Sequence, residues 1–289
     1  MAVELKPGDR VGIIAGGGFL PLHVARTLRS HGHDPFVLIV EGEPATDAGL
    51  SDFPNASLPV EKFARFIPAL RRERVSHVVM AGAITRRPKW SAVEWSWPLM
   101  KMLAAAVPAL ARGDDALLKA IIAQFDRHGL KVVGPHEVVP DLMAQSGPMT
   151  ATKPDRAGQR DIDAAREAAL AIGKLDIGQG AVAVGGRAIA LEGIEGTDGL
   201  LERVRELRGH GRLAGRTGGV LVKLSKPGQE LRADLPGIGP RTVDDAHAAG
   251  LKGIGVEAGR TFLLDYDATV RRADELGLFI VGLDGGEGT

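Results

Sequence analysis

The feature that most constrains the fold is the alternation of short apolar segments with amphipathic segments along the first 139 residues. Strands are expected at residues 11–15, 36–40, 77–81 and 130–133, and helices at 20–31, 63–73 and 114–128. Strands that alternate with helices favour a parallel sheet covered on both faces. We therefore predict an α/β protein whose N-terminal domain, residues 1–139, is a Rossmann-like parallel sheet.

The composition changes after Val139. Residues 140–160 are rich in Pro, Gly, Ser, Thr and Gln, which is typical of a linker. Beyond it, helices are expected at 162–172, 197–207, 242–249 and 266–276, and strands at 181–184, 188–192, 219–222, 253–256, 262–265 and 279–283. Residues 161–289 are thus a second α/β domain, interpreted as the catalytic one, whose topology the sequence leaves open.

Charge and composition exclude several classes of protein. The 289 residues carry 36 basic and 36 acidic side chains and no cysteine. There is no overall positive field for nucleic acid, so phosphate binding has to come from local clusters, and disulfides and thiolate metal sites are excluded. No secretory signal is visible at the N-terminus, and Pro98–Ala111 is too short to span a bilayer. We expect a cytoplasmic protein.

A glycine triplet, Gly16, Gly17 and Gly18, lies between the first expected strand and its helix. Backbone N–H groups at a helix N-terminus bind anions, which predicts a cradle for nucleotide phosphate. A third glycine of the dinucleotide fingerprint is missing, and no P-loop is present. Glu41, at the end of the second strand, would nevertheless suit the ribose of a nicotinamide cofactor. A turn needed only for packing is the third alternative.

A loop rich in Pro and Gly, residues 223–239, follows a short apolar run. It carries the cations Lys223, Lys226 and Arg232, the amide Gln229 and the single aspartate Asp234. Lysine and arginine suit phosphate oxygens, and an aspartate among them can hold a metal ion or orient water. The alternative is a solvated turn with incidental ion pairs.

Two further clusters have both a structural and a functional interpretation. Asp114 and Asp115 begin an expected helix, where acids cap the helix or hold Mg²⁺ against a diphosphate. The three tryptophans fall within Trp90–Trp97, beside an apolar helix at residues 99–110. They either pack in a core or form an apolar trough for acyl chains or a bilayer surface. No histidine spacing of a zinc site and no Gly-x-Ser-x-Gly elbow occurs, which favours a metal-assisted water as the attacking group.

The loop sequence Lys-x-x-Lys-Pro-x-Gln followed by Arg-x-Asp-Leu-Pro-x-Ile-Gly resembles the LpxI-type UDP-2,3-diacylglucosamine pyrophosphatases of lipid A biosynthesis. Further pieces match that family in order along nearly the whole chain. They are Ile14–Gly18 with Pro21, Ala81-Gly82 with Arg86 and Pro88, Gly113–Leu118, His136–Val138, Asp176–Gly180, Glu195–Asp198, and Gly253-Ile254 with Glu257–Gly259.

The resemblance implies hydrolysis of the diphosphate of UDP-2,3-diacylglucosamine to UMP and 2,3-diacylglucosamine 1-phosphate (lipid X), with Mg²⁺ or Mn²⁺ as cofactor. It implies a catalytic Asp234, and metal ligation by Asp234, Asp198, Asp114 and Asp115. The expected substrate-binding residues are Gly16, Gly17, Gly18, Leu20, Ala81, Gly82, Gln179, Thr197, Lys223, Lys226 and Arg232. From its position alone, Thr197 is equally suited to cap a helix.

The expected partner is a lipid-linked nucleotide sugar and not a nucleic acid. Peripheral contact with the inner membrane surface and assembly into a homo-oligomer stay open. Two alternative functions also stay open at this point: an NAD(P)-dependent oxidoreductase, and a non-catalytic protein that binds a nucleotide sugar or lipid.

Overall fold

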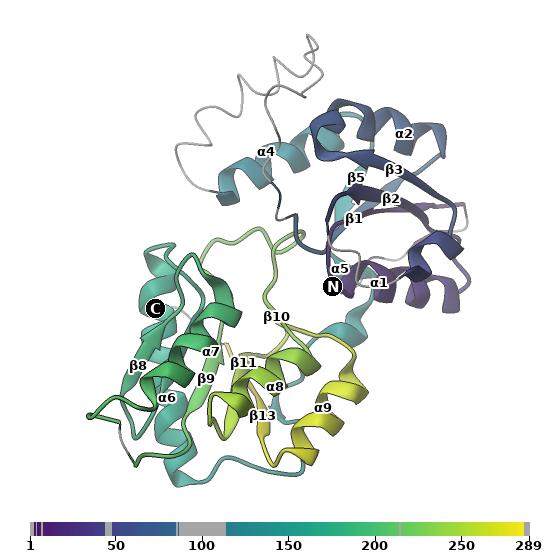
Figure 1. Ribbon diagram of the computed structural model, residues 1–289. Helices are drawn as coiled ribbons and strands as arrows, with labels where there is room; N and C mark the ends of the chain where they lie inside the picture. Colours follow the sequence, from purple (N-terminus) through teal and green to yellow (C-terminus); the bar gives the residue numbers. More distant parts are fainter. Residues whose placement is uncertain are drawn as a thin grey trace. The chain divides into compact units, whose positions relative to one another are not determined.

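The computed structural model describes residues 8–43, 48–84, 114–213 and 215–285, together with positions 3, 5, 6 and 86; of residues 48 and 114–117 only the backbone is described. The chain forms two compact α/β units (Figure 1). Unit 1 contains residues 1–141 and 230–234, and unit 2 contains residues 142–229 and 235–289. The α/β class with a parallel N-terminal sheet is confirmed.

The described part of unit 1 is built on a parallel sheet in the order β3-β2-β1-β4-β5. Its strands are β1 (Val11–Ala15), β2 (Phe36–Glu41), β3 (Asn55–Pro59), β4 (His77–Ala81) and β5 (Lys131–Val133). β1 is buried along its whole length, as its uninterrupted apolar sequence predicts for a central parallel strand. The chain order reverses between β1 and β4, which lie side by side at the centre of the sheet.

The described helices of unit 1 are α1 (Leu20–Ser30), α2 (Phe66–Arg72), α4 (Asp114–Arg127) and the short α5 (Pro135–Val138), with 3₁₀ turns η1 (Ala48–Asp52), η2 (Val60–Arg65) and η4 (Pro140–Leu142). Phe66 of α2 and Phe125 of α4 pack on Leu38 and Val78 from the strands. α1 and α5 contact each other and β4.

Unit 2 contains a mixed sheet in the order β6-β13-β11-β9-β7-β8. The three central strands β9 (Val220–Lys223), β11 (Gly253–Glu257) and β13 (Phe279–Leu283) are parallel. The antiparallel strands are β6 (Gly147–Pro148) at one edge and β7 (Gly180–Ala183) with β8 (Ala188–Leu191) at the other. β10 (Gly237–Ile238) and β12 (Phe262–Leu263) form a separate parallel pair.

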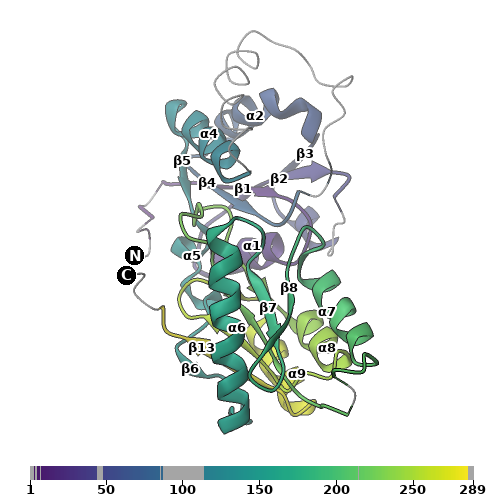
Figure 2. The same ribbon diagram turned by 90° about the vertical axis from the view of Figure 1, so that its left-hand side faces the viewer.

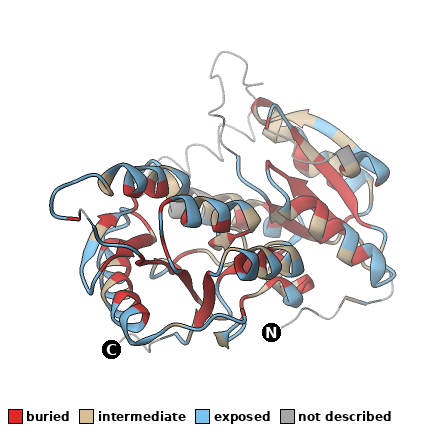
Figure 3. Ribbon diagram, turned by 60° about the horizontal axis from the view of Figure 1, so that its bottom comes forward, coloured by how far each residue is buried: buried red, intermediate tan, exposed pale blue. Residues whose placement is uncertain are grey.

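Each face of this sheet is covered by helices (Figure 2). Val220 and Val222 of β9 pack on α6 (Arg156–Lys174), whereas Leu221, between them, faces the other core. That second core receives α7 (Gly196–Leu207), α8 (Pro240–Ala248) and α9 (Tyr266–Glu275). The two-residue alternation of strand side chains explains this division. In both units the central strands are the most buried elements (Figure 3).

The expected linker at residues 140–160 is wrong. From Leu142 onward the segment belongs to unit 2, where β6 pairs with β13 and Ala144 is 2% exposed in the core. Its last residues, 156–160, already form the first turns of α6, for which Asp155 is the N-cap and accepts a 2.6 Å hydrogen bond from Gly158 N. The Pro, Gly and Ser content marks tight turns in this segment rather than a spacer.

A second difference concerns residues 230–234, which were expected to lie in the C-terminal domain. They belong to unit 1, and Ala233 packs against the unit 1 core. The chain therefore passes between the units three times. In the described part of the chain, no helix combines the length and the apolarity that a membrane crossing requires.

Candidate active site

The glycine triplet of unit 1 lies at the carboxyl ends of β1 and β4. Gly16 N donates to Ala81 O at 2.8 Å and Gly17 N donates to Ala83 O at 2.8 Å. These hydrogen bonds join the two loops at the point where the strand order of the sheet reverses. In open parallel sheets, ligands bind in the crevice at this position. The structure therefore brings together Gly16, Gly17, Ala81 and Gly82, four of the residues expected to bind substrate.

The glycines are required by close approach of the two backbones. A Cβ on Gly16 would lie 2.6 Å from Ala83 O, and one on Gly82, which has φ of 84°, would strike Gly17 O. Gly18, at φ 95°, has open space around it. Close packing therefore explains the glycine at position 16 but not the one at position 18.

Helix α1 begins directly after this turn, at the half-buried Leu20. Its N-cap, Phe19, makes no side-chain capping hydrogen bond, and the first turn holds no acid. The first four N–H groups of a helix have no partner within it, although Pro21 lacks this group. This end of α1 therefore offers an electropositive backbone to an anion.

Arg86 and Glu43 are additional polar residues at this edge that the predicted site did not include. Arg86 N donates to Glu43 Oε1 at 3.0 Å, and the Arg86 guanidinium lies against Gly42, which follows β2 with φ of 82°. Glu41, which kept the nicotinamide alternative open, is the exposed last residue of β2. In the sequence, Arg86 belongs to the segment beginning at Ala81-Gly82 that resembles the LpxI family, and this position could have identified it.

The turn at residues 230–234 presents Asp234 on unit 1. Ala233 N and Asp234 N both donate to Glu230 O, at 3.1 and 3.0 Å, and Asp234 is exposed. Arg232 forms a bidentate pair with Glu230, with Nε–Oε1 at 2.8 Å and Nη2–Oε2 at 2.9 Å. Because its ends are bonded and Ala233 is packed, the turn holds the aspartate in a fixed place.

The Glu230–Arg232 pair is the strongest electrostatic feature of this turn. Hydrogen bonding to Arg232 lowers the pKa of Glu230, and the same contact raises the pKa of Arg232. Asp126 lies 3.8 Å from Arg232 Nη1 and adds to its negative surroundings. Arg232 therefore stays charged, but its guanidinium is already shared with acids.

His136 is a half-buried polar neighbour of this turn. Its ring lies over Gly134, and the Arg232 Cα would be 3.2 Å from a Cβ on that glycine. Among the residues that the structure describes, His136 Nδ1 has no hydrogen-bond partner, and burial lowers the pKa of the imidazole. Burial of the ring therefore favours its neutral form.

A second group of expected residues gathers in unit 2 at the carboxyl ends of β9 and β11. Lys223 lies between Gly180 and Val256 in the sheet register, and its buried side chain donates from Nζ to Gly237 O at 3.1 Å. Lys226, just beyond the strand, pairs with Asp176 at 2.7 Å. The two lysines therefore belong to unit 2, whereas Arg232 and Asp234 belong to unit 1. The charged residues of the loop at 223–239 are thus divided between the two units.

Gln179 and Thr197 lie at the same edge of unit 2. The backbone O of Gln179 accepts a 2.9 Å hydrogen bond from Leu224 N, directly after β9. Thr197 Oγ1 donates to Glu192 Oε1 at 3.3 Å. The N-cap of α7 is Glu195, so Thr197 does not cap this helix.

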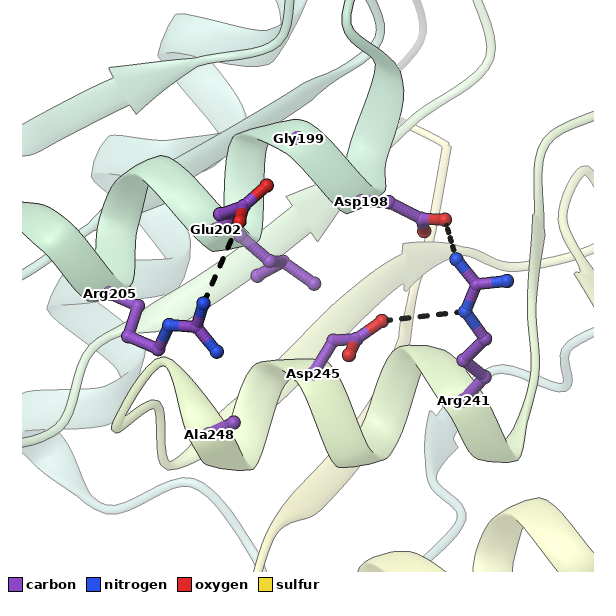
Figure 4. Close-up of a pocket in the computed structure, with 8 residues that line it drawn as sticks. Asp198, Gly199, Glu202, Arg205, Arg241, Asp245 and Ala248 are labelled. Atoms are coloured by element: carbon purple, nitrogen blue, oxygen red, sulfur yellow. Dashed lines mark hydrogen bonds and ion pairs between the residues drawn. The ribbon is translucent and has the colours of Figure 1, made fainter.

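Asp198 lies in a pocket of about 260 Å³ between α7 and α8 (Figure 4). Its carboxylate is in an ion pair with Arg241, which also lies 3.8 Å from Asp245. Burial raises the pKa of Asp245, and the charge of Asp198 adds to this effect. The acids of this pocket are matched by arginines, which is typical of a surface ion-pair network rather than a metal site.

The remaining metal candidates are not placed. α4 begins at Asp114, but the side chains of Asp114 and Asp115 lie outside the described residues, as do the tryptophans and the helix expected at 99–110. Within the described part of the chain, no three His, Asp or Glu side chains gather into a group that could hold a metal ion.

Comparison with known proteins identifies the family. The model of the LpxI N-terminal domain matches residues 10–142, and that of the LpxI C-terminal domain matches residues 145–281. A UDP-2,3-diacylglucosamine pyrophosphatase LpxI from Caulobacter vibrioides is 39% identical over 279 residues, 95% of this chain and 98% of the relative. Among solved structures, CobK precorrin-6A reductase aligns over 97% of this chain and 90% of its own at 16% identity, with a TM-score of 0.32, which is too low to bear on fold or function. The chain belongs to the LpxI family.

Proposed function

We propose that this protein hydrolyses the diphosphate of UDP-2,3-diacylglucosamine, releasing UMP and 2,3-diacylglucosamine 1-phosphate. The observation that carries the proposal is the near full-length match to a relative named UDP-2,3-diacylglucosamine pyrophosphatase. Family membership favours neither of the two alternatives, the NAD(P)-dependent oxidoreductase and the non-catalytic protein that binds a nucleotide sugar or lipid. Lipid A biosynthesis is the setting that this activity implies.

The edge of the sheet at the carboxyl ends of β1 and β4 supports the nucleotide half of this proposal. The uncapped N-terminus of α1 and the exposed Gly18 offer backbone N–H groups to a phosphate, and Arg86 adds a cation at the same edge. Binding the uridine diphosphate here requires no side-chain acid or base. The role of this edge is to bind and orient.

The reaction itself needs positive charge on the diphosphate and a placed water. On unit 1, Arg232 supplies positive charge next to Asp234, and its guanidinium must exchange Glu230 for phosphate oxygens when substrate binds. Asp234 is the carboxylate that we assign to the attacking water, because it is exposed on a turn whose backbone is fixed. Its role is to accept the proton of that water or to orient it.

We further propose a divalent cation, Mg²⁺ or Mn²⁺, as cofactor. Asp234 fits such an ion together with diphosphate oxygens and waters, since Mg²⁺ takes as few as one or two protein carboxylates. Asp198 fits less well because Arg241 already neutralises it. When bound, the ion would stabilise negative charge on the phosphoryl oxygens.

The same proposal places the protein in the cytoplasm at the inner membrane surface, because a substrate with two acyl chains resides in a bilayer. Support comes from exposed apolar side chains of unit 2: Leu175 is 71%, Ile177 54% and Ile194 101% exposed. Homo-oligomer formation has no such support in the described residues.

The test is UMP release from UDP-2,3-diacylglucosamine and from UDP-sugars without acyl chains, each with and without EDTA. Asp234→Ala should lower the rate at least about 100-fold, as expected for loss of a proton-transfer group. Asp52→Ala, an exposed aspartate of unit 1 outside the site, is the matched control. No UMP release by the wild type, or a melting shift with NAD instead, would refute the proposed function.

A further inference from the structure

Glu257 is a carboxylate at the carboxyl end of β11 to which the proposed reaction assigns no role. It is the last residue of this central strand of unit 2, and its side chain is 14% exposed. In open α/β sheets, ligands bind beyond the carboxyl ends of the strands. A carboxylate at this position either contacts the ligand itself or holds another residue in place.

The contacts of Glu257 favour the second of these roles. Its Oε2 accepts two hydrogen bonds from Ser225, one from the backbone N at 2.9 Å and one from Oγ. Its Oε1 lies 3.8 Å from Arg260 Nε. Two donors thus occupy one oxygen and a guanidinium faces the other, so the carboxylate is directed at the protein rather than at a ligand.

Ser225 lies between the two lysines of the loop at 223–239. It is 8% exposed and comes two residues after Lys223, the last residue of β9, which pairs with Val256 of β11. Hydrogen bonds to a charged acceptor are roughly twice as strong as neutral ones. Glu257 therefore fixes the direction in which the chain leaves β9 by tying it to the neighbouring strand.

The segment that follows Ser225 is a turn closed by its own hydrogen bonds. Lys226 N donates to Gln229 Oε1 at 2.8 Å, and Gln229 N donates to Lys226 O at 3.2 Å. Gly228, at φ 78°, supplies the left-handed residue that this turn requires. Because the turn is bonded within itself, the contact between Ser225 and Glu257 sets where the whole turn stands on unit 2.

The cation that this turn carries is Lys226, one of the residues expected to bind substrate. Its Nζ lies 2.7 Å from Asp176 Oδ1, and the two side chains are 28% and 58% exposed. An ion pair that reaches solvent contributes little to stability, so a phosphate oxygen can replace the carboxylate. The backbone of Lys226 is thus fixed, while its ammonium group can exchange one anion for another.

We propose that Glu257 is a positioning residue which, through Ser225, holds Lys226 where it binds a phosphate group of the substrate. Glu257 itself touches neither the substrate nor the attacking water. The inference rests on the proposed function, which supplies the diphosphate.

The test is a double-mutant cycle on the affinity for UDP, which carries a diphosphate and needs no turnover. Glu257→Ala and Lys226→Ala should each weaken UDP binding about 10-fold, as expected for loss of a contact with a charged group. The double variant should bind less than about twofold more weakly than Lys226→Ala, because Glu257 has nothing to position once the lysine is removed. Losses that multiply to about 100-fold, or unchanged affinity in either single variant, would overturn the inference.

Conservative variants separate positioning from a general loss of folding. Glu257→Gln keeps an oxygen that can accept from Ser225, so it should hold UDP affinity within about threefold of the wild type. Ser225→Ala removes the hydroxyl but keeps the backbone hydrogen bond, and it replaces Glu257→Ala in the cycle if that variant does not fold. Glu275→Ala, at an exposed glutamate of α9, is the matched control.

The outcomes also distinguish this inference from the proposed function. A wild type that binds UDP but releases no UMP would refute the proposed function and leave the cycle intact. A Glu257→Gln variant as weak as Glu257→Ala would show that the hydrogen bonds to Ser225 are not what Glu257 contributes, which would overturn the positioning role.

Discussion

The close approach of the glycine turn to the loop after β4 makes Gly16→Ala a quantitative test of the proposed nucleotide site. The new Cβ would lie 2.6 Å from Ala83 O and 2.9 Å from Gly82 O. The first distance is roughly 0.8 Å shorter than ordinary van der Waals contact. Both neighbours are backbone atoms, so neither can swing aside as a flexible side chain would.

The expected cost has two parts. Overpacking costs about 1–3 kcal/mol, and separating the loops weakens the hydrogen bonds of Gly16 N and Gly17 N, each worth about 1 kcal/mol. The sum of about 2–5 kcal/mol is a large share of a typical unfolding free energy of about 5–15 kcal/mol. Unit 1 should therefore still fold, with a urea midpoint lowered by roughly 1–2 M.

Hydrogen exchange followed by mass spectrometry measures the loss of stability separately in each unit. Peptides covering β1 and β4 should lose protection in Gly16→Ala, whereas peptides covering β9 and β11 in unit 2 should not. UMP affinity, measured by calorimetry, should fall at least about 10-fold, because the binding backbone is displaced. Gly32→Ala, after the end of α1 and outside the site, is the matched control: its φ of 83° costs about 1–2 kcal/mol, but no atom lies within 4 Å of the new methyl group. If Gly16→Ala kept wild-type protection and UMP affinity, the close packing of these loops would not support the nucleotide site.

Three further outcomes follow from the site. Glu230→Gln removes the charge that holds Arg232 in its bidentate pair. The kcat of the variant should therefore change less than its KM, and steady-state kinetics measures both constants. Burial lowers the pKa of His136 and of His77 in the folded state, so the unfolded chain binds more protons near pH 6. The free energy of unfolding should therefore fall as the pH drops below about 6.5. His136→Asn should reduce this loss in urea titrations from pH 8 to 5. Exhaustive chelation should abolish hydrolysis and Mg²⁺ or Mn²⁺ should restore it, whereas full activity in EDTA would remove the metal from the proposal.

Local patterns in the sequence were sufficient for most of the elements. Apolar runs identified β1, β2, β4 and β9, because a strand buried on both faces is mostly apolar; the polar residues His77 and Lys223 lie only at the ends of β4 and β9. Among the described strands, the sequence missed β3, β6 and β10. β3, Asn55–Pro59, is an edge strand whose partly exposed residues carry no such run, and the other two are only two residues long. Residues 140–160 were misread because glycine and proline mark a tight turn and a spacer alike.

The sequence by itself also determined which chemical groups are available: a glycine turn before a helix, an aspartate among cations, and no thiol. Only the tertiary structure decided which of these groups meet. It placed Asp234 on unit 1, paired Lys226 with Asp176 and Asp198 with Arg241, and buried Glu192 beside Gly180. Strand and helix preferences arise from neighbours within a few residues along the chain. Ion pairs and burial depend on residues tens of positions apart, which are brought together only when the sheets and helices pack.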